Sequence, residues 1–312
     1  MSTHQTASAA EDAPTSVEAG GPLLSLIMAT YGRTAELMPA IASLVAQTDR
    51  TFELIVVDQN KDERIAPLLE PARKAGLEVQ HVRQTIPNLS AARNAGMKVA
   101  RGEVVAFPDD DCWYEPEVVA RVRSRLIAKP ALDGVVARWV EIDPALRRPA
   151  GALSGEAWRR FRGGDATSFT LFLKPARIRE LGGFDPRLGT GRWFGAGEET
   201  DLILRMLTAG HQIDYVPAAG IHHWHADWPE ATRAQIKRQR SYARGTGAIY
   251  VKHKVPPAIV LRGIAAPLAK ALTAPRPLQA LLLGALTSLG RIEGMIGWSL
   301  GPGRQPRPPE AT

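Results

Sequence analysis

The chain has 312 residues, of which 45% are apolar and 6% aromatic, and its formal net charge is +7. These values allow one large or two small globular domains with a substantial core. The excess of positive charge favours an anionic partner, such as a nucleotide, a phospholipid headgroup or a nucleic acid. The single cysteine, Cys112, excludes an intrachain disulfide and suits a reducing compartment. We expect its side chain to pack in the interior rather than to bind a metal.

Residues 1–20 lack the basic start and the apolar run of a secretory signal, and their composition predicts a disordered tail. No apolar run reaches the length that spans a bilayer, because the longest, 278–290, is too short. We therefore expect a cytoplasmic protein. Peripheral attachment to the cytoplasmic face of the inner membrane is a further expectation, which rests on the C-terminal residues described below.

Strands and helices alternate over the first half of the chain. Apolar runs predict strands at 23–29, 52–57, 77–82 and 104–107. Apolar residues at helical spacing predict helices at 34–47, 63–75, 89–100 and 115–128, the first with Thr34 as its N-cap. This order predicts an α/β fold with a mainly parallel central sheet and helices on both of its faces.

The second half of the chain is less regular. Strands are predicted at 135–140, 167–173 and 213–216, helices at 198–208 and 228–251, and a long loop at 143–164. Residues 256–300 are apolar and broken by prolines. We therefore divide the chain into a tail (1–20), an α/β domain (21–228) and a basic and apolar helical C-terminal extension (229–312).

Three aspartates, Asp109, Asp110 and Asp111, directly follow the fourth predicted strand. Clustered carboxylates repel one another, and a hard divalent cation would make such a cluster favourable. Ligands of open α/β sheets bind at the carboxyl ends of the strands. The run therefore predicts a cation that holds a phosphate-bearing substrate, and a solvated turn or a helix N-cap is the alternative.

Other predicted strands also end in candidate binding residues. The first strand ends in small and polar residues that would let a nucleotide approach the backbone, namely Ala29, Thr30, Tyr31 and Arg33. Asp58 ends the second strand, where it would either accept a hydrogen bond from a base or ribose or cap the next helix. Arg93, in the helix predicted at 89–100, either faces the ligand or lies on the surface.

Three acids, Glu198, Glu199 and Asp201, begin the helix predicted at 198–208, after a glycine-rich loop that carries Trp193. The helix dipole favours acids in a first turn, but an acid beside such a loop is also well placed as a general base. Three histidines in four residues, His223 among them, follow the last predicted strand and offer a metal ligand or a phosphate donor.

Taken together, these motifs resemble a family 2 inverting glycosyltransferase of the GT-A fold. The matching stretches are 24–33, 54–60, 88–102, 105–111 and 182–205. The resemblance implies a GT-A type nucleotide-diphospho-sugar transferase fold, with 21–228 as the catalytic domain. It implies transfer of a sugar from a nucleotide sugar, with a UDP-sugar favoured, to a sugar, lipid-linked or glycan acceptor in cell-envelope polysaccharide or glycolipid synthesis.

The resemblance also implies roles for the candidate residues. Asp109 and Asp111 match the DxD aspartates that hold Mn²⁺ or Mg²⁺, and His223 matches a histidine near the metal and diphosphate. Glu199 takes the position of the general base, where the family more often has Asp, and Asp201 is its rival. The nucleotide-binding positions are Ala29, Thr30, Tyr31, Arg33, Asp58, Arg93 and Asp110, and the loop around Trp193 would close over the sugar.

Two other classes of protein fit the sequence less well. A nucleotidyltransferase that makes nucleotide sugars would need a glycine-rich first loop with several basic residues, whereas 29–33 has one Gly and one Arg. A nucleic-acid-binding protein would place aromatic residues beside its basic ones, and the basic run 233–254 contains only Tyr242 and Tyr250. We therefore expect no nucleic-acid partner.

The C-terminal extension is unusual in its charge, because no residue between Glu230 and Glu293 is acidic. A basic helix beside an apolar segment is typical of proteins that lie on an anionic membrane surface. The alternative is a set of solvated helices packed on the catalytic domain. The family resemblance favours the membrane.

Overall fold

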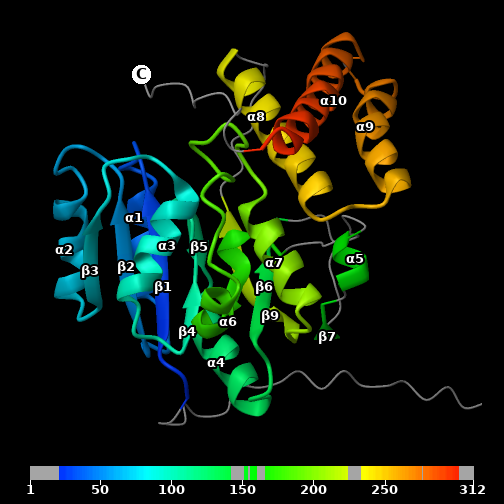
Figure 1. Ribbon diagram of the computed structural model, residues 1–312. Coiled ribbons are helices and arrows are strands. Elements are labelled where there is room, and N and C mark those ends of the chain that lie inside the picture. Colours follow the sequence, from blue (N-terminus) through cyan, green and yellow to red (C-terminus); the bar gives the residue numbers. More distant parts are fainter. Residues whose placement is uncertain are drawn as a thin grey trace, which may run out of the picture.

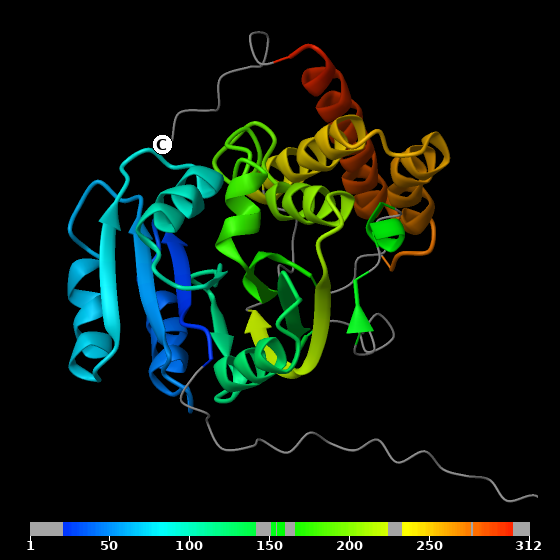
Figure 2. The same cartoon turned by 60° about the horizontal axis from the view of Figure 1, so that its bottom comes forward.

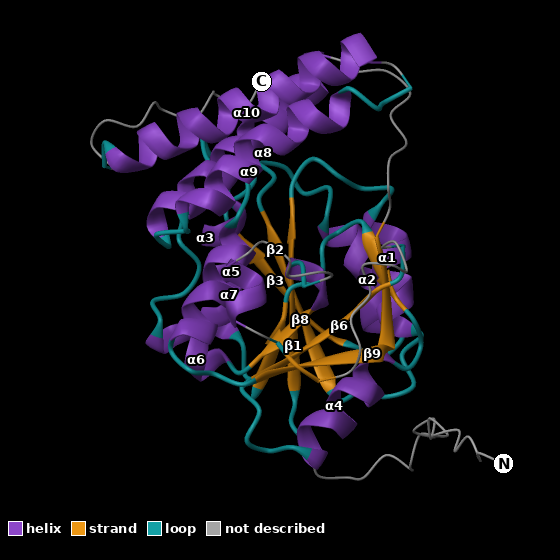
Figure 3. Ribbon diagram, turned by 90° about the vertical axis from the view of Figure 1, so that its right-hand side faces the viewer, coloured by secondary structure: helices purple, strands orange, loops and turns teal. Residues whose placement is uncertain are grey.

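The computed structural model describes residues 21–141, 151–153, 155–159, 166–223, 233–275 and 277–301. The tail at 1–20 and most of the loop predicted at 143–164 lie outside the described residues. The described part forms three layers, in which a central sheet has helices on both faces (Figure 3). Three C-terminal helices, α8 to α10, lie across one end of the sheet (Figure 1).

The first half of the chain confirms the predicted alternation of strands and helices. Its strands are β1 (Leu24–Thr30), β2 (Phe52–Asp58), β3 (Glu78–Arg83) and β4 (Val104–Ala106). These four strands pair with one another in parallel. Its helices are α1 (Leu37–Val45), α2 (Ala66–Lys74), α3 (Leu89–Val99) and α4 (Val118–Ala128). The N-cap prediction for Thr34 is wrong, because α1 begins at Leu37 after Glu36 and no side chain caps it.

The second half of the sheet is mixed. Its strands are β5 (Cys112–Tyr114), β6 (Gly134–Trp139), β7 (Gly151–Ala152), β8 (Leu171–Leu173) and β9 (Ile213–His223). The strand order is β3-β2-β1-β4-β8-β6-β9-β5, with β7 paired to β9. β8 runs antiparallel to both β4 and β6, so the parallel half and the mixed half meet at β4 (Figure 2).

Several elements of the second half differ from the prediction. The strand expected at 167–173 begins as a 3₁₀ turn, Ser168–Thr170, and only its last three residues form β8. The loop expected at 143–164 contains β7 and a short helix, α5 (Gly155–Arg159). β9 continues seven residues past the predicted end at 216 and stops at His223. The remaining helices of this half are α6 (Pro175–Glu180) and α7 (Glu198–Thr208).

A hydrophobic core lies on each face of the sheet. On one face, α1, α2 and α4 bury side chains such as Ile41, Leu69 and Val122. On the other, α3, α6 and α7 bury side chains such as Met97 and Leu202. β1 and β2 are buried on both sides, which is why they read as continuous apolar runs rather than as alternating ones.

The C-terminal helices are α8 (Arg233–Lys252), α9 (Pro257–Ala271) and α10 (Pro277–Ser299). α10 approaches α8 closely, because a Cβ atom at Gly294 would collide with the carbonyl oxygen of Arg244. Glu293 of α10 forms ion pairs with Arg240 and Arg244 of α8. These contacts join the last helix to the rest of the protein.

Within the described part of the chain, one helix, Leu278–Ser299, is long and apolar enough to cross a bilayer by length and composition, with a mean hydropathy of 1.2. The sequence expectation that this segment is too short is therefore wrong. The consecutive apolar run does end at Gly290, but the helix continues through Arg291 and Glu293 to Ser299.

Candidate active site

The candidate site lies where the strands of the parallel half end. Thr30 closes β1, Asp58 closes β2, and the aspartate run follows β4. Asp109 still pairs with Ala29 in a parallel bridge, so the chain stays in the sheet until it reaches the first aspartate. The polar residues that the sequence places after separate strands therefore meet at one edge of the sheet.

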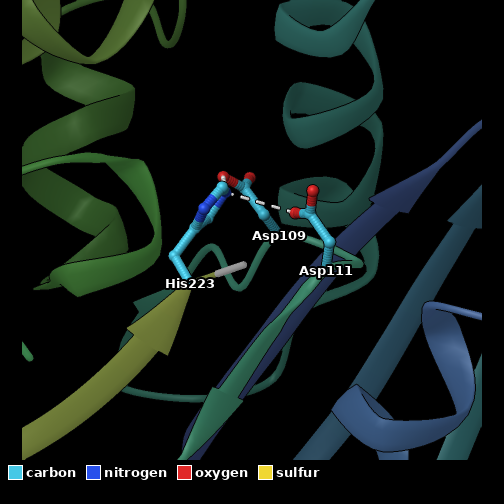
Figure 4. A group of neighbouring side chains, drawn as sticks. All are labelled: Asp109, Asp111 and His223. Atoms are coloured by element: carbon cyan, nitrogen blue, oxygen red, sulfur yellow. Dashed lines mark ion pairs between the residues drawn. The ribbon is translucent and has the colours of Figure 1, made fainter. Parts of the chain in front are cut away.

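Asp109, Asp111 and His223 converge on one point (Figure 4). His223 Nε2 lies 3.3 Å from a carboxylate oxygen of Asp111 and 4.0 Å from one of Asp109. The pairing of β5 with β9 produces this contact, because Cys112 lies opposite His223 in the antiparallel register. One oxygen or nitrogen atom from each of the three residues lies within 4.8 Å of the other two. The predicted metal residues are thus brought together by a strand, β5, that the sequence analysis missed.

The donor set fits a divalent cation. Carboxylates bind Mg²⁺ and Mn²⁺, and an imidazole binds first-row transition metals, so all three residues are possible ligands of a divalent cation. Burial raises the pKa of Asp109, and the neighbouring Asp111 charge adds to the effect. Burial would lower the pKa of His223, but the hydrogen bond and charge of Asp111 raise it instead. A bound cation would disfavour the protonated form of His223, so the affinity for the cation would rise with pH.

Asp110 turns away from this cluster and holds the β1 end. It accepts a hydrogen bond of 2.7 Å from the Thr30 hydroxyl and pairs with the Arg33 guanidinium. The same guanidinium nitrogen lies 2.7 Å from Asp111. Burial raises the pKa of Asp110 to about 6, although Arg33 opposes the shift. The structure thus joins Thr30, Arg33 and the aspartate run into one polar network.

Arg93 links the aspartate run to α7. Its guanidinium is buried, 3.0 Å from Asp109 and 2.9 Å from Glu198. It lies beside the edge-to-face pair of Phe107 and Phe184, with the guanidinium carbon 5.9 Å and 5.4 Å from their ring centroids. A charge buried this deeply needs two anionic partners, and the alternative of a surface position for Arg93 is wrong.

The two leading acids of α7 have different surroundings. Glu198 is buried against Arg93, whereas the neighbouring Glu199 is half-buried. Removal from water, together with the charge of Glu198, raises the pKa of Glu199 to about 8. Gly197 precedes the helix at a φ of +95°, a conformation that a side chain would strain, so it directs the helix start into the site. A carboxylate whose pKa lies near neutrality has the proton affinity that general-base chemistry uses.

Asp201 is fully buried and bound by two cations and an imidazole. Arg205 lies 2.8 Å from its carboxylate, Lys252 2.7 Å and His253 2.8 Å. Burial would raise the pKa of Asp201, but the hydrogen bond from His253 and the charges of Arg205 and Lys252 lower it. This carboxylate joins α7 to the end of α8.

Comparison with known proteins identifies the part of the chain that carries Asp109 and Asp111. Residues 25–174 match the family model "Glycosyl transferase family 2". The chain carries a family 2 glycosyltransferase domain. A relative at 27% identity is the pre-mycofactocin glycosyltransferase of Mycobacterium tuberculosis, matched over 56% of this chain and 38% of its own length. The first curated relatives are matched over 28% to 38% of their own length.

Solved structures show that the fold extends beyond the matched residues. The mannosyltransferase PcManGT from Pyrobaculum calidifontis, in complex with GDP-Man and Mn²⁺, has a TM-score of 0.63 at 17% identity, covering 90% of this chain and 88% of the other. TarS 1–349 from S. aureus, in complex with UDP, has a TM-score of 0.54 at 15% identity, covering 89% and 92%. The expected α/β fold of GT-A type, with C-terminal helices, is confirmed.

The family 2 domain surrounds Asp58 with partners that the sequence analysis missed. Asp58 is completely buried and accepts hydrogen bonds from the backbone and side chain of Asn60. Its other oxygen lies 3.0 Å from His81 and 3.2 Å from Arg83, both on β3. The polar sequence of β3, with Gln80, His81 and Arg83 in six residues, was the available signal.

Two further predicted nucleotide-binding residues lie at the end of β1. Tyr31 is exposed there, and Ala29 lies beside Asp109.

The loop before α7 is held by the C-terminal helices. Trp193 contacts Phe194 edge to face, and Arg244 of α8 lies over its ring at 4.7 Å. A Cβ atom at Gly297 of α10 would collide with the Trp193 ring. This loop therefore packs against α8 and α10 in the structure, and its closure over the sugar stays a prediction.

Proposed function

We propose that the protein is a metal-dependent inverting glycosyltransferase that moves a sugar from a nucleotide sugar to an acceptor hydroxyl. The observation that carries the proposal is the convergence of Asp109, Asp111 and His223 at the end of β4, linked through Arg93 to the acids of α7. The family 2 domain and the nucleotide and nucleotide-sugar complexes of structures with the same fold support it.

The donor would bind across the ends of β1, β2 and β4. Bound to Asp109, Asp111 and His223, Mn²⁺ or Mg²⁺ would neutralise the charge that develops on the nucleoside diphosphate leaving group. Arg33 and Thr30 keep the first loop in place through Asp110, and Asp58 with its β3 partners forms the wall on the nucleobase side. A UDP-sugar is our preferred donor.

Glu199 would act as the general base. Inversion needs one group that removes the proton of the acceptor hydroxyl on the face opposite the leaving group, and it needs no covalent sugar intermediate. Glu199 is half-buried with a raised pKa, so it holds a proton well once it has accepted one. Arg93 would bridge Glu198, the residue before Glu199, to Asp109 and so hold the start of α7 at a set distance from the aspartate run. Asp201 has no free oxygen directed at the site and would position α7 instead.

The acceptor is, in this proposal, a sugar, glycan or lipid-linked molecule of the cell envelope, and the enzyme works in the cytoplasm or at the cytoplasmic face of the membrane. The excess of basic residues in the C-terminal helices supports an acceptor at an anionic surface.

A binding experiment tests the donor half of the proposal without an acceptor. We expect Mn²⁺ with one of UDP, GDP, ADP, CDP or TDP to raise the unfolding temperature, because a ligand at about 100 times its Kd adds about 2.7 kcal/mol of stability. Asp111→Asn should remove this stabilisation, and Asp62→Asn, an exposed aspartate bound only to its neighbours, should keep it. If no diphosphate stabilises the protein, the proposal fails. If one does, a donor-hydrolysis screen across nucleotide sugars would identify the sugar.

A further inference from the structure

One face of α10 is apolar and exposed to solvent. The large side chains on this face are between 40% and 84% exposed. Their spacing confines them to an arc of about 100° on the helix. They are Leu278, Leu281, Leu282, Leu289, Ile292 and Ile296. We call these residues the α10 apolar face. Globular proteins rarely expose so long an apolar stripe without a partner for it.

The surroundings of the α10 apolar face are basic. The adjacent helix α9 exposes Leu261 together with Arg262 and Lys270, and Leu272, directly after the helix, is exposed as well. No acidic residue occurs between Glu230 and Glu293, and Glu293 is itself paired with two arginines of α8. An apolar stripe within a field of positive charge is complementary to an anionic lipid surface. It is not complementary to a second copy of itself, because the like charges would repel.

A large cavity connects the metal residues to α10. It has a volume of about 1590 Å³, well above the range of about 300–1000 Å³ that is usual for small-molecule sites. Asp111 and His223 line it, and so do Gln279 and Leu283 of α10. Gln279 lies one helical turn from Leu282 of the apolar face. None of the described residues of β2, β3 or α3 lines it, so this space is separate from the nucleobase side.

We propose that the α10 apolar face lies on an anionic lipid bilayer, and that the cavity takes its acceptor, a hydroxyl-bearing amphiphile, from that bilayer. The origin of the acceptor rests on the proposed function, whereas the membrane contact does not. The helix lies along the surface instead of spanning it, because its opposite face is packed on α8 at Gly294. Glu293, at the edge of the apolar face, is held by ion pairs with Arg240 and Arg244 of α8. The polar end of the acceptor would reach Asp111 and His223, and its apolar part would follow Leu283 toward the lipid.

Flotation with liposomes tests the membrane contact. We expect the full chain to float with vesicles of phosphatidylcholine and phosphatidylglycerol in equal parts, and poorly with phosphatidylcholine alone. The double variant Leu282→Glu/Leu289→Glu should bind the mixed vesicles on the order of tenfold or more weakly, since each buried Leu contributes about that factor. Ile86→Glu, at a side chain that is 72% exposed in the loop between β3 and α3, is the matched control and should float normally.

Three results would overturn the membrane contact. One is equal flotation of the double variant and the wild type. Another is retention of the protein on vesicles after an alkaline carbonate wash, which would mean a spanning helix. The third is a dimer in light scattering that the double variant dissociates, which would assign the apolar face to a second copy. Stabilisation by Mn²⁺ and a nucleoside diphosphate should be unchanged in the double variant, so these results do not depend on the proposed function.

A soluble amphiphile tests the cavity. Dodecyl maltoside below its micellar concentration should raise the unfolding temperature of the wild type, and maltose should not, because the apolar chain provides the binding. Leu283→Glu should lose the shift while it keeps normal flotation, since Leu283 lines the cavity and is not part of the apolar face. An equal response of the wild type and Leu283→Glu, or an equal effect of maltose, would remove the cavity from the proposal.

Discussion

Replacing Asp201 with asparagine separates the two candidate bases. The wild-type carboxylate is fully buried and neutralises Arg205, Lys252 and His253. Asparagine keeps the volume of the side chain but removes its charge, so two cations and an imidazole lose their common partner. Removing one partner of a buried ion pair costs about 3–5 kcal/mol. At about 2–4 °C for each kcal/mol, the unfolding temperature should fall by roughly 10 °C.

The assay measures stability and transfer on the same samples. Differential scanning calorimetry gives the unfolding temperature, and transfer is measured well below it, per mole of folded protein. We expect Asp201→Asn to lose stability but to keep most of its turnover, and Glu199→Gln to keep stability but to lose about 10²- to 10⁴-fold in turnover. Asp62→Asn controls for the loss of an exposed charge. The reasoning is refuted if Asp201→Asn unfolds within about 2 °C of the wild type yet loses transfer, because Asp201 would then be the base.

Three further predictions concern charge. The raised pKa of Glu199 leaves its carboxylate protonated below about pH 8, so turnover should increase as the pH rises through that value. If the Glu199→Gln variant shows the same pH dependence, the assignment of Glu199 as the base is contradicted. Arg93→Met should leave Asp109 and Glu198 without their shared cation and weaken Mn²⁺-dependent nucleotide binding in calorimetry, whereas unchanged binding would show that the bridge is only structural. The ion pairs that lower the pKa of Glu293 stabilise the fold above about pH 4.5, and this contribution is lost as the pH falls. The free energy of unfolding should therefore fall less steeply with acid in Glu293→Gln than in the wild type. Identical acid transitions would contradict this role of Glu293.

The parallel half of the fold was predictable because its signals are local. β1 and β2 are buried on both faces and read as apolar runs, and the aspartate run follows β4 without interruption. The position of an aspartate at a strand end is a property of nearby sequence. The metal residues Asp109 and Asp111 could therefore be proposed from the chain alone.

The rest depends on contacts between distant residues. β5 is three residues long and follows the aspartates directly, so it is too short for a periodic pattern of apolar residues to predict it. Its register with β9 nevertheless brings His223 to Asp111. Asp201 and Glu199 are both acidic and two residues apart, and they are distinguished by distant partners, Lys252 at the end of α8 and His253 directly after it. The prediction for Asp110 had no physical basis until the structure placed it against Thr30 and Arg33.

The bridge formed by Arg93 has a consequence for the evolution of the chain. It joins Asp109, within the residues that match the family model, to Glu198, which lies beyond their end at residue 174. A recombination event between these segments would exchange one partner without the other and would leave a buried charge uncompensated. The two segments are therefore expected to be inherited as one piece, although only the first is recognisable from its sequence family.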